Sequence, residues 1–159
     1  MKTTYFKQLV TLLLIALFTY TATSKFLDYD KFVFQMRLAP VPLMSLLAPV
    51  LGWVVPAIEM LIAITLAAGF FYVPLKIKGL WASVILLTIF EVYIMAMLLS
   101  GSHLPCTCGG IISQMGWKQH LIFNAFFIIG GMLSINFLRK EKTSAPDRNG
   151  DETKILSRA

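Results

Sequence analysis

Charged residues are scarce in this chain of 159 residues. They make up 14% of the sequence, whereas about 25% is usual in soluble domains. Cysteine and histidine are scarcer still, with two of each, and all four fall between His103 and His120. The shortage of charge excludes an ordinary soluble domain. Together with a hydrophobic content of 57%, it indicates a small membrane protein.

Four apolar stretches are long enough, or nearly so, to cross a bilayer core roughly 30 Å thick as helices. They cover residues 7–24, 46–72, 79–100 and 117–138. We therefore expect an all-α polytopic membrane protein, with a four-transmembrane-helix bundle over residues 1–138. Residues 139–159 mix charges with Ser, Pro, Asn and Gly, which predicts a disordered cytoplasmic tail.

The first stretch also has features of a cleaved signal peptide, with two lysines before it and the small-residue segment TATS near its end. The apolar run is long for a signal peptide, however, and its removal would leave three helices without a fourth packing partner. We expect it to remain as the first span.

Basic residues predict which side of the membrane each loop faces, because cytoplasmic loops hold an excess of Lys and Arg. The side with both termini and the 72–78 loop carries ten of them, against four on the other side: Lys25, Lys31, Arg37 and Lys118. We therefore expect a bacterial inner-membrane protein with both termini in the cytoplasm and the cysteine loop in the oxidising periplasm. Topology and the anionic lipid surface account for the basic excess, so no nucleic-acid partner is expected.

The first external loop, residues 25–44, is longer and less polar than a connector requires. Apolar side chains recur there at helical spacing: Tyr29, Phe32, Val33 and Met36. Asp30 is a candidate N-cap, and Pro40 and Pro42 would end the helix. The pattern predicts a short interfacial helix on the membrane surface, either packed on the bundle or acting as a lid over a reactive site.

Both cysteines lie in the segment HLPCTCGG, in a polar break between the third and fourth apolar stretches. Pro105 and the pair Gly109-Gly110 indicate a sharply bent backbone rather than a core position. Cys106 and Cys108 could be a redox dithiol, a pair of metal ligands or two inert thiols. A disulfide closed across one residue would be strained, and strained disulfides are easily reduced.

A metal site would need further donors beside the two thiolates, and the nearby candidates are His103, Met115 and His120. Such a soft set of ligands suits Cu(I) or zinc. His120 has two other interpretations. It could cap the fourth span at the interface, or it could form a polar stripe with Asn124, four residues further along the same helix face.

Two acids, Glu59 and Glu91, lie near the middle of the second and third apolar stretches. An ionisable group is costly at that depth and usually faces the bundle interior. As neutral acids they could hydrogen-bond across helices, with Asn124, Tyr93 or Thr65 as candidate partners. Alternatively they could relay the two protons that accompany each dithiol/disulfide turnover. Glu59 and Glu91 are therefore candidate catalytic residues beside Cys106 and Cys108.

Four segments of the sequence resemble the MauE/DoxX group of redox-associated integral membrane proteins, and fit best its Bacteroidetes-type members with a Cys-x-Cys-Gly-Gly loop. The segments are TSKFLDYDKF, VVPAIEMLIA, FEVYIMAMLLSGSHLPCTCGGI and MGWKQHLIFN, and the resemblance spans roughly residues 10–138. Other members have Cys-x-Cys-Phe-Gly at the loop, so Gly109 departs from that version. The resemblance implies a four-helix membrane bundle associated with periplasmic thiol–disulfide chemistry.

The architecture is also similar to that of DsbB and vitamin K epoxide reductase, which hold a quinone. This chain lacks their Cys-x-x-Cys motif and their second cysteine pair, so no motif supports a quinone here. A redox-active disulfide is the group we expect.

The sequence as a whole predicts a thiol–disulfide redox protein that exchanges electrons or disulfides with a periplasmic or membrane protein partner. The alternatives are a non-enzymatic accessory subunit of an envelope complex, a metal-binding membrane protein that uses the same cysteines, and, more remotely, a proton-coupled transporter.

Overall fold

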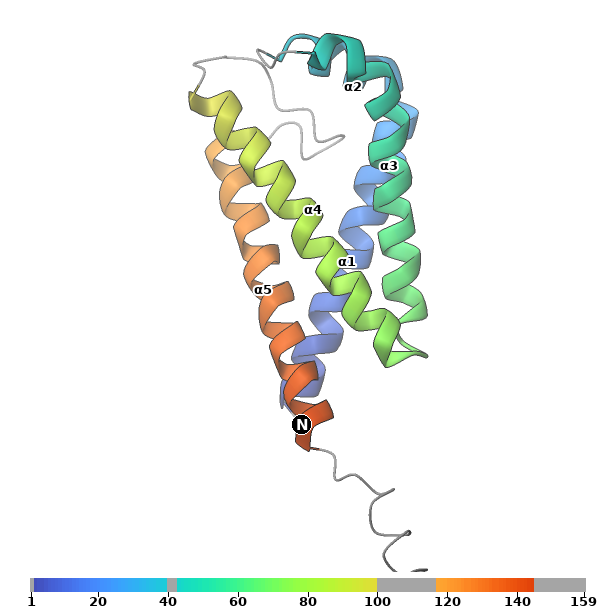
Figure 1. Ribbon diagram of the computed structural model, residues 1–159, viewed down its shortest axis with the longest axis vertical. Helices are drawn as coiled ribbons and strands as arrows, with labels where there is room; N and C mark the ends of the chain where they lie inside the picture. The colour runs from blue at the N-terminus through green and yellow to red at the C-terminus, as the bar shows by residue number, and fades with distance from the viewer. Residues whose placement is uncertain (1, 40–42, 100–116, 145–159) are drawn as a thin grey trace, which may run out of the picture.

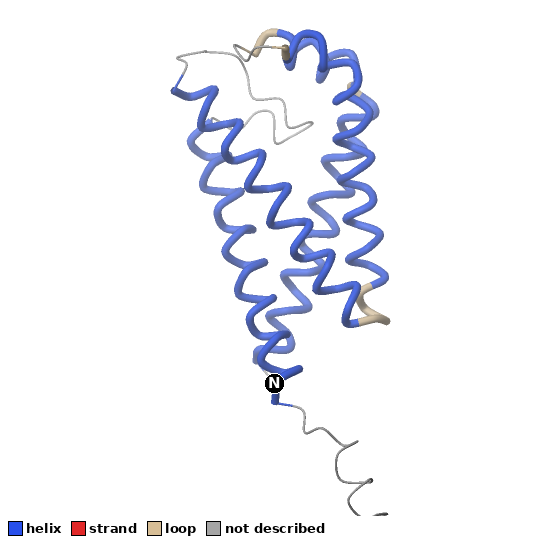
Figure 2. Tube along the Cα trace, viewed as in Figure 1, coloured by secondary structure: helices blue, strands red, loops and turns tan. Residues whose placement is uncertain are grey.

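The computed structural model describes residues 2–39, 43–99 and 117–144 of the chain. Its five helices are α1 (Lys2–Leu27), α2 (Tyr29–Arg37), α3 (Met44–Ala68), α4 (Val73–Leu99) and α5 (Trp117–Ser144). Over the described ranges there is no strand (Figure 2). The predicted all-α fold is therefore confirmed.

Four of the helices, α1, α3, α4 and α5, are long and apolar enough to cross a membrane. They form two antiparallel pairs, α1 with α3 and α4 with α5, and these pairs pack on each other mainly through α3 against α4 and α1 against α5 (Figure 1). One end of the bundle gathers the start of α1, the α3–α4 turn and the end of α5. We call this the terminal end, and the opposite end, which α2 covers, the α2 end.

Three helices are longer than the predicted apolar stretches. α1 covers Lys2–Leu27 rather than residues 7–24. α4 begins at Val73 rather than at residue 79, because Pro74 is tolerated in a first helical turn, where its missing N–H has no helical partner to lose. α5 continues beyond residue 138 to Ser144. Charged residues can extend a helix past the apolar core of a bilayer, and Glu141 in this extension forms an ion pair with Lys7 of α1.

The core follows one stripe of α1, where buried side chains recur every three or four residues as expected for a helix that faces its neighbours. Leu14 and Phe18 are the largest apolar members of this stripe, and they pack with Leu66 of α3, Leu80 of α4 and Ile135 of α5. Many large apolar side chains elsewhere on the four long helices are exposed, as lipid contact requires. The sequence therefore folds as a bundle with a lipid-facing exterior.

The short helix α2 crosses one end of the bundle and packs on the first turns of α3 (Figure 1). Val33 and Met36 of α2 are buried with Ala48 of α3. The Tyr29 hydroxyl donates a hydrogen bond of 3.0 Å to the Pro49 carbonyl. The predicted helix is therefore present, held by both apolar and polar contacts.

The start of α2 corrects one detail of the sequence analysis. Asp28, not Asp30, occupies the N-cap position, and its side chain makes no capping hydrogen bond. The Tyr29 ring packs at 5.1 Å from the Trp53 ring of α3, which fixes the helix start at Tyr29. Asp30 consequently falls in the first turn, where a carboxylate favours the positive end of the helix dipole. Pro40 and Pro42 lie outside the described residues.

Gly52 allows α2 to approach α3 closely. A Cβ atom at this position would lie 2.6 Å from Val33 Cγ2 and 2.7 Å from Tyr29 Cε2. A Cβ at Gly130, in contrast, would meet Val10 at ordinary van der Waals distances of 3.6 and 3.7 Å. The two glycines therefore form a matched pair, both helical but different in their packing.

We expect Gly52→Ala to destabilise the protein by about 1–2 kcal/mol, because α2 must move away from α3. Gly130→Ala should leave the stability unchanged or raise it slightly, because alanine favours the helix more than glycine does. Thermal unfolding in detergent gives the melting temperature of each variant. Equal melting temperatures for the two would contradict the close α2–α3 packing.

Candidate functional site

An ion pair lies buried in the half of the bundle nearer the α2 end. Lys25 Nζ of α1 is 2.5 Å from Glu59 Oε1 of α3. Lys25 is 4% exposed and Glu59 only 1%. Either charge alone would be very costly in an apolar bundle, so each residue makes the burial of the other tolerable.

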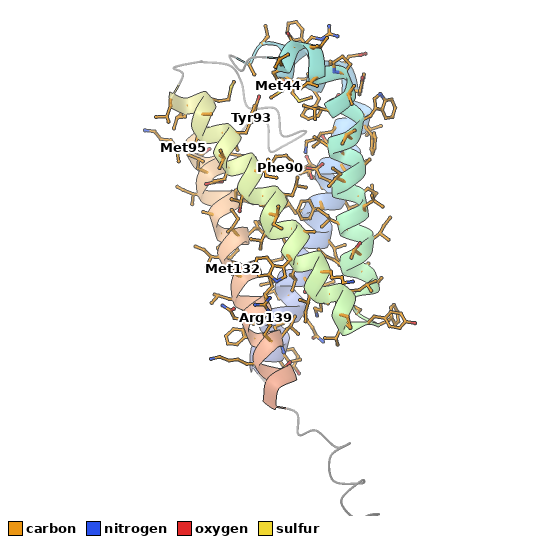
Figure 3. All side chains as sticks on the ribbon, in the orientation of Figure 1. Met44, Phe90, Tyr93, Met95, Met132 and Arg139 are labelled. Carbon is orange, nitrogen blue, oxygen red and sulfur yellow. The ribbon has the colours of Figure 1, made fainter. Side chains whose placement is uncertain are left out.

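Helix direction explains why these two side chains meet. Side chains tilt toward the N-terminus of their own helix, so Lys25, in the last turn of α1, reaches back into the bundle. Glu59 tilts toward the α2 end, where α3 begins, and the two side chains converge. Two aromatic rings flank the ammonium group, with centroids 5.7 Å away for Phe32 of α2 and 5.3 Å away for Phe90 of α4. Figure 3 shows Phe90 on the side of α4 that faces α3.

α5 contributes two more buried polar residues, His120 and Asn124. His120 lies within electrostatic range of Lys25. Asn124, one turn further along α5, lies beside the half-buried Glu91 carboxyl of α4. The predicted polar stripe on this face of α5 is therefore present, with His120 near Lys25 and Asn124 beside Glu91.

We call these five residues the buried polar cluster: Lys25, Glu59, Glu91, His120 and Asn124. Within the described ranges, one buried polar atom on each of four members has no hydrogen-bond partner: Glu59 Oε2, Glu91 Oε2, His120 Nδ1 and Asn124 Nδ2. Buried polar atoms nearly always have a partner, so four such atoms in one cluster are unusual. The cluster therefore has polar atoms inside the bundle that are free to form further hydrogen bonds. These atoms come from α3 in one helix pair and from α4 and α5 in the other.

The sequence analysis missed the partner of Glu59. Thr65, a candidate partner, instead donates its hydroxyl to the Leu61 carbonyl of its own helix at 2.7 Å. Lys25 was counted only as a loop charge. The signal was nevertheless present, because the buried stripe of α1 repeats at helical spacing and ends on this residue: Lys7, Thr11, Leu14, Phe18, Ala22 and Lys25.

Cys106, Cys108 and His103 lie outside the described residues, as does Met115. Of the five metal ligands considered, the structure describes only His120, which is buried. Among the described residues, no group of three or more His, Cys, Asp or Glu side chains could hold a metal ion.

Lys25→Met alone should destabilise the protein by about 3–5 kcal/mol, because Glu59 would remain buried without a counter-charge. The double variant Lys25→Met with Glu59→Gln should recover much of this loss, because neither charge is then buried. Thermal unfolding in detergent gives the comparison, with Lys31→Met on the exposed side of α2 as the control. A double variant no more stable than Lys25→Met would contradict the pairing.

Comparison with known proteins adds one match. Residues 3–137 match the family of the methylamine utilisation protein MauE. No curated protein and no solved structure matches the chain. The match extends through all four long helices and the buried polar cluster, and it confirms the MauE part of the resemblance while the DoxX part stays a prediction. The chain, a protein with four candidate membrane spans, therefore belongs to the MauE family.

Proposed function

We propose that this protein is a thiol–disulfide redox protein of the inner membrane, which exchanges electrons or disulfides with a periplasmic partner through Cys106 and Cys108. The family description associates the chain with membrane accessory proteins of methylamine utilisation. Thiol exchange is the chemistry that we propose within that accessory role.

The proposed exchange conserves atoms and electrons. One thiolate of the reduced pair, Cys106 or Cys108, attacks a disulfide of the partner and forms a mixed disulfide, releasing one partner thiolate. The other cysteine then attacks the mixed disulfide, which frees the second partner thiol and leaves Cys106 and Cys108 oxidised. Two electrons pass to the partner, and two protons leave the cysteine pair. The reverse sequence oxidises a partner dithiol.

The observation that carries this proposal is the buried polar cluster. In the sequence both cysteines lie between α4 and α5, and the end of α4 and the start of α5 are at the α2 end of the bundle. The cluster draws Glu91 from the last third of α4 and His120 from the first turn of α5. Residues that can gain or lose protons thus lie on the two helices next to the reactive segment.

Glu59 and Glu91 have different roles in this proposal. Glu59 is held by Lys25, so it tunes the electrostatic environment and fixes the ammonium group in place. Glu91 lies beside the neutral Asn124 and forms no ion pair among the described residues, so we assign the proton-exchange role to it. The predicted catalytic set of two cysteines and two acids thus gains Lys25 as a positioning residue.

The second candidate is a non-enzymatic accessory subunit, in which the cysteines tie the loop or bind a metal and the bundle docks on a larger envelope complex. The family description favours an accessory role without specifying redox chemistry. A stoichiometric partner retained by the double variant Cys106→Ser with Cys108→Ser would support this candidate. Zinc or copper lost in the same variant would support the metal site.

Cysteine trapping tests thiol exchange directly. Either Cys106→Ser or Cys108→Ser should accumulate a mixed disulfide with a partner, because the second thiol that resolves it is missing. Non-reducing gel electrophoresis of cell envelopes shows the adduct, and the double serine variant is the control. Thiol exchange is wrong if neither single variant traps a partner and both thiols of the wild type remain reduced in the envelope.

Reporter fusions test the proposed topology. Alkaline phosphatase, which is active only outside the cytoplasm, should be active when fused after residue 110 and inactive when fused after residue 144. Fluorescent-protein fusions should give the opposite result. The charge bias predicts this outcome, and active phosphatase at the second position would reverse the topology.

A further inference from the structure

The terminal end of the bundle holds a second buried group of charges, which thiol exchange does not use. Lys7 of α1 is 4% exposed and Lys76 of α4 is 8% exposed. Lys7 lies near the start of α1 and Lys76 in the first turn of α4, so both are at the terminal end of the bundle. Lysine is rarely buried to this extent unless it is paired, so the partners of these two side chains decide what they can bind.

Of the two lysines, only Lys7 forms an ion pair with a described carboxylate. Lys7 Nζ lies 2.6 Å from Glu141 Oε1, and the Glu141 side chain is 59% exposed. Lys76 Nζ faces the Phe70 ring, 5.1 Å from its centroid. In the parts of the chain that the structure describes, no carboxylate lies within ion-pair distance of Lys76. Lys7, Lys76 and Glu141 interact electrostatically, and two positive charges against one negative charge leave the group with a net charge of +1.

The local backbone also favours an anion. Lys76 lies in the first turn of α4, where the helix dipole is positive, and this turn contains no acid. The other basic side chains nearby are oriented differently. Arg139, labelled in Figure 3, packs with its guanidinium carbon 5.4 Å from the Trp81 ring centroid, and Lys78 is exposed. Of the basic side chains that the structure describes at this end, Lys7 and Lys76 are therefore the two that are buried in the bundle.

We propose that Lys7 and Lys76 bind the phosphate of an anionic phospholipid headgroup at the terminal end of the bundle. Basic sites between transmembrane helices at the headgroup level are suited to such lipids. Exposed Phe71 and Tyr72, in the adjacent turn, are amphipathic or apolar side chains of the kind that contact lipid at this depth. Inorganic phosphate has the same binding chemistry, so the test must separate the two.

Native mass spectrometry of the detergent-purified protein, titrated with phosphatidylglycerol, measures the affinity. Lys76→Gln should lower the affinity for the first bound lipid about fivefold, because one buried charge is lost. Lys78, two residues further along α4, is exposed. Lys78→Gln removes a charge of the same sign there, and it should change the affinity less than twofold. Melting temperatures of both variants establish that they are folded.

Glu141→Gln provides a test with the opposite sign. Glu141 competes with the phosphate for Lys7, and it is exposed enough to be replaced without disturbing the core. Its removal should therefore raise the affinity for phosphatidylglycerol about two- to threefold. A lysine pair with a purely structural role would not give tighter binding in this variant.

Three outcomes would overturn the proposal. The first is an equal loss of affinity in Lys76→Gln and Lys78→Gln, which would indicate general surface attraction. The second is lipid binding that does not change in Glu141→Gln. The third is tight binding of inorganic phosphate that phosphatidylglycerol does not displace, which would assign the site to a free anion. None of these measurements depends on the cysteines, so they are independent of the proposed thiol exchange.

Discussion

A lysine and a glutamate buried side by side in an apolar bundle must stay together, because the membrane interior leaves either charge without water to solvate it. Lys25 and Glu59 impose this requirement on α1 and α3, at a distance of 2.5 Å. The pair sets the rotation of both helices about their axes in this half of the bundle. α2 also approaches this pair, since the Phe32 ring centroid lies 5.7 Å from the same ammonium group.

This pair is one half of the buried polar cluster. α1 and α3 contribute a neutralised pair, while α4 and α5 contribute Glu91, His120 and Asn124. Glu59 thus lies next to a fixed positive charge, whereas Glu91 lies next to a neutral amide. Membership of the MauE family does not by itself specify redox chemistry. The proposed thiol exchange rests instead on Glu91 and His120, which lie on the two helices that adjoin the cysteine segment in the chain.

α1 connects the two polar regions of the protein. Its buried stripe begins at Lys7 and ends at Lys25, with an apolar core centred on Leu14 and Phe18 between them. Each lysine has a carboxylate partner on another helix, Glu141 of α5 and Glu59 of α3. α1 thus contacts its own partner α3 and also α5 of the other pair. Charges make these contacts at its two ends, and apolar side chains make them in its middle.

The sequence alone determined the number and type of the long helices, because length and hydrophobicity are sufficient to define a membrane span. It also determined α2 and the two membrane acids, which are visible from spacing and from the cost of a charge at that depth. It did not give the partner of Glu59, because two residues 34 positions apart meet only through the way α1 packs on α3. The N-cap of α2 and the extension of α5 to Ser144 likewise depend on contacts with other helices: Tyr29 with Trp53, and Lys7 with Glu141. Periodicity shows which face of a helix is buried, but only the tertiary structure decides which residue that face meets.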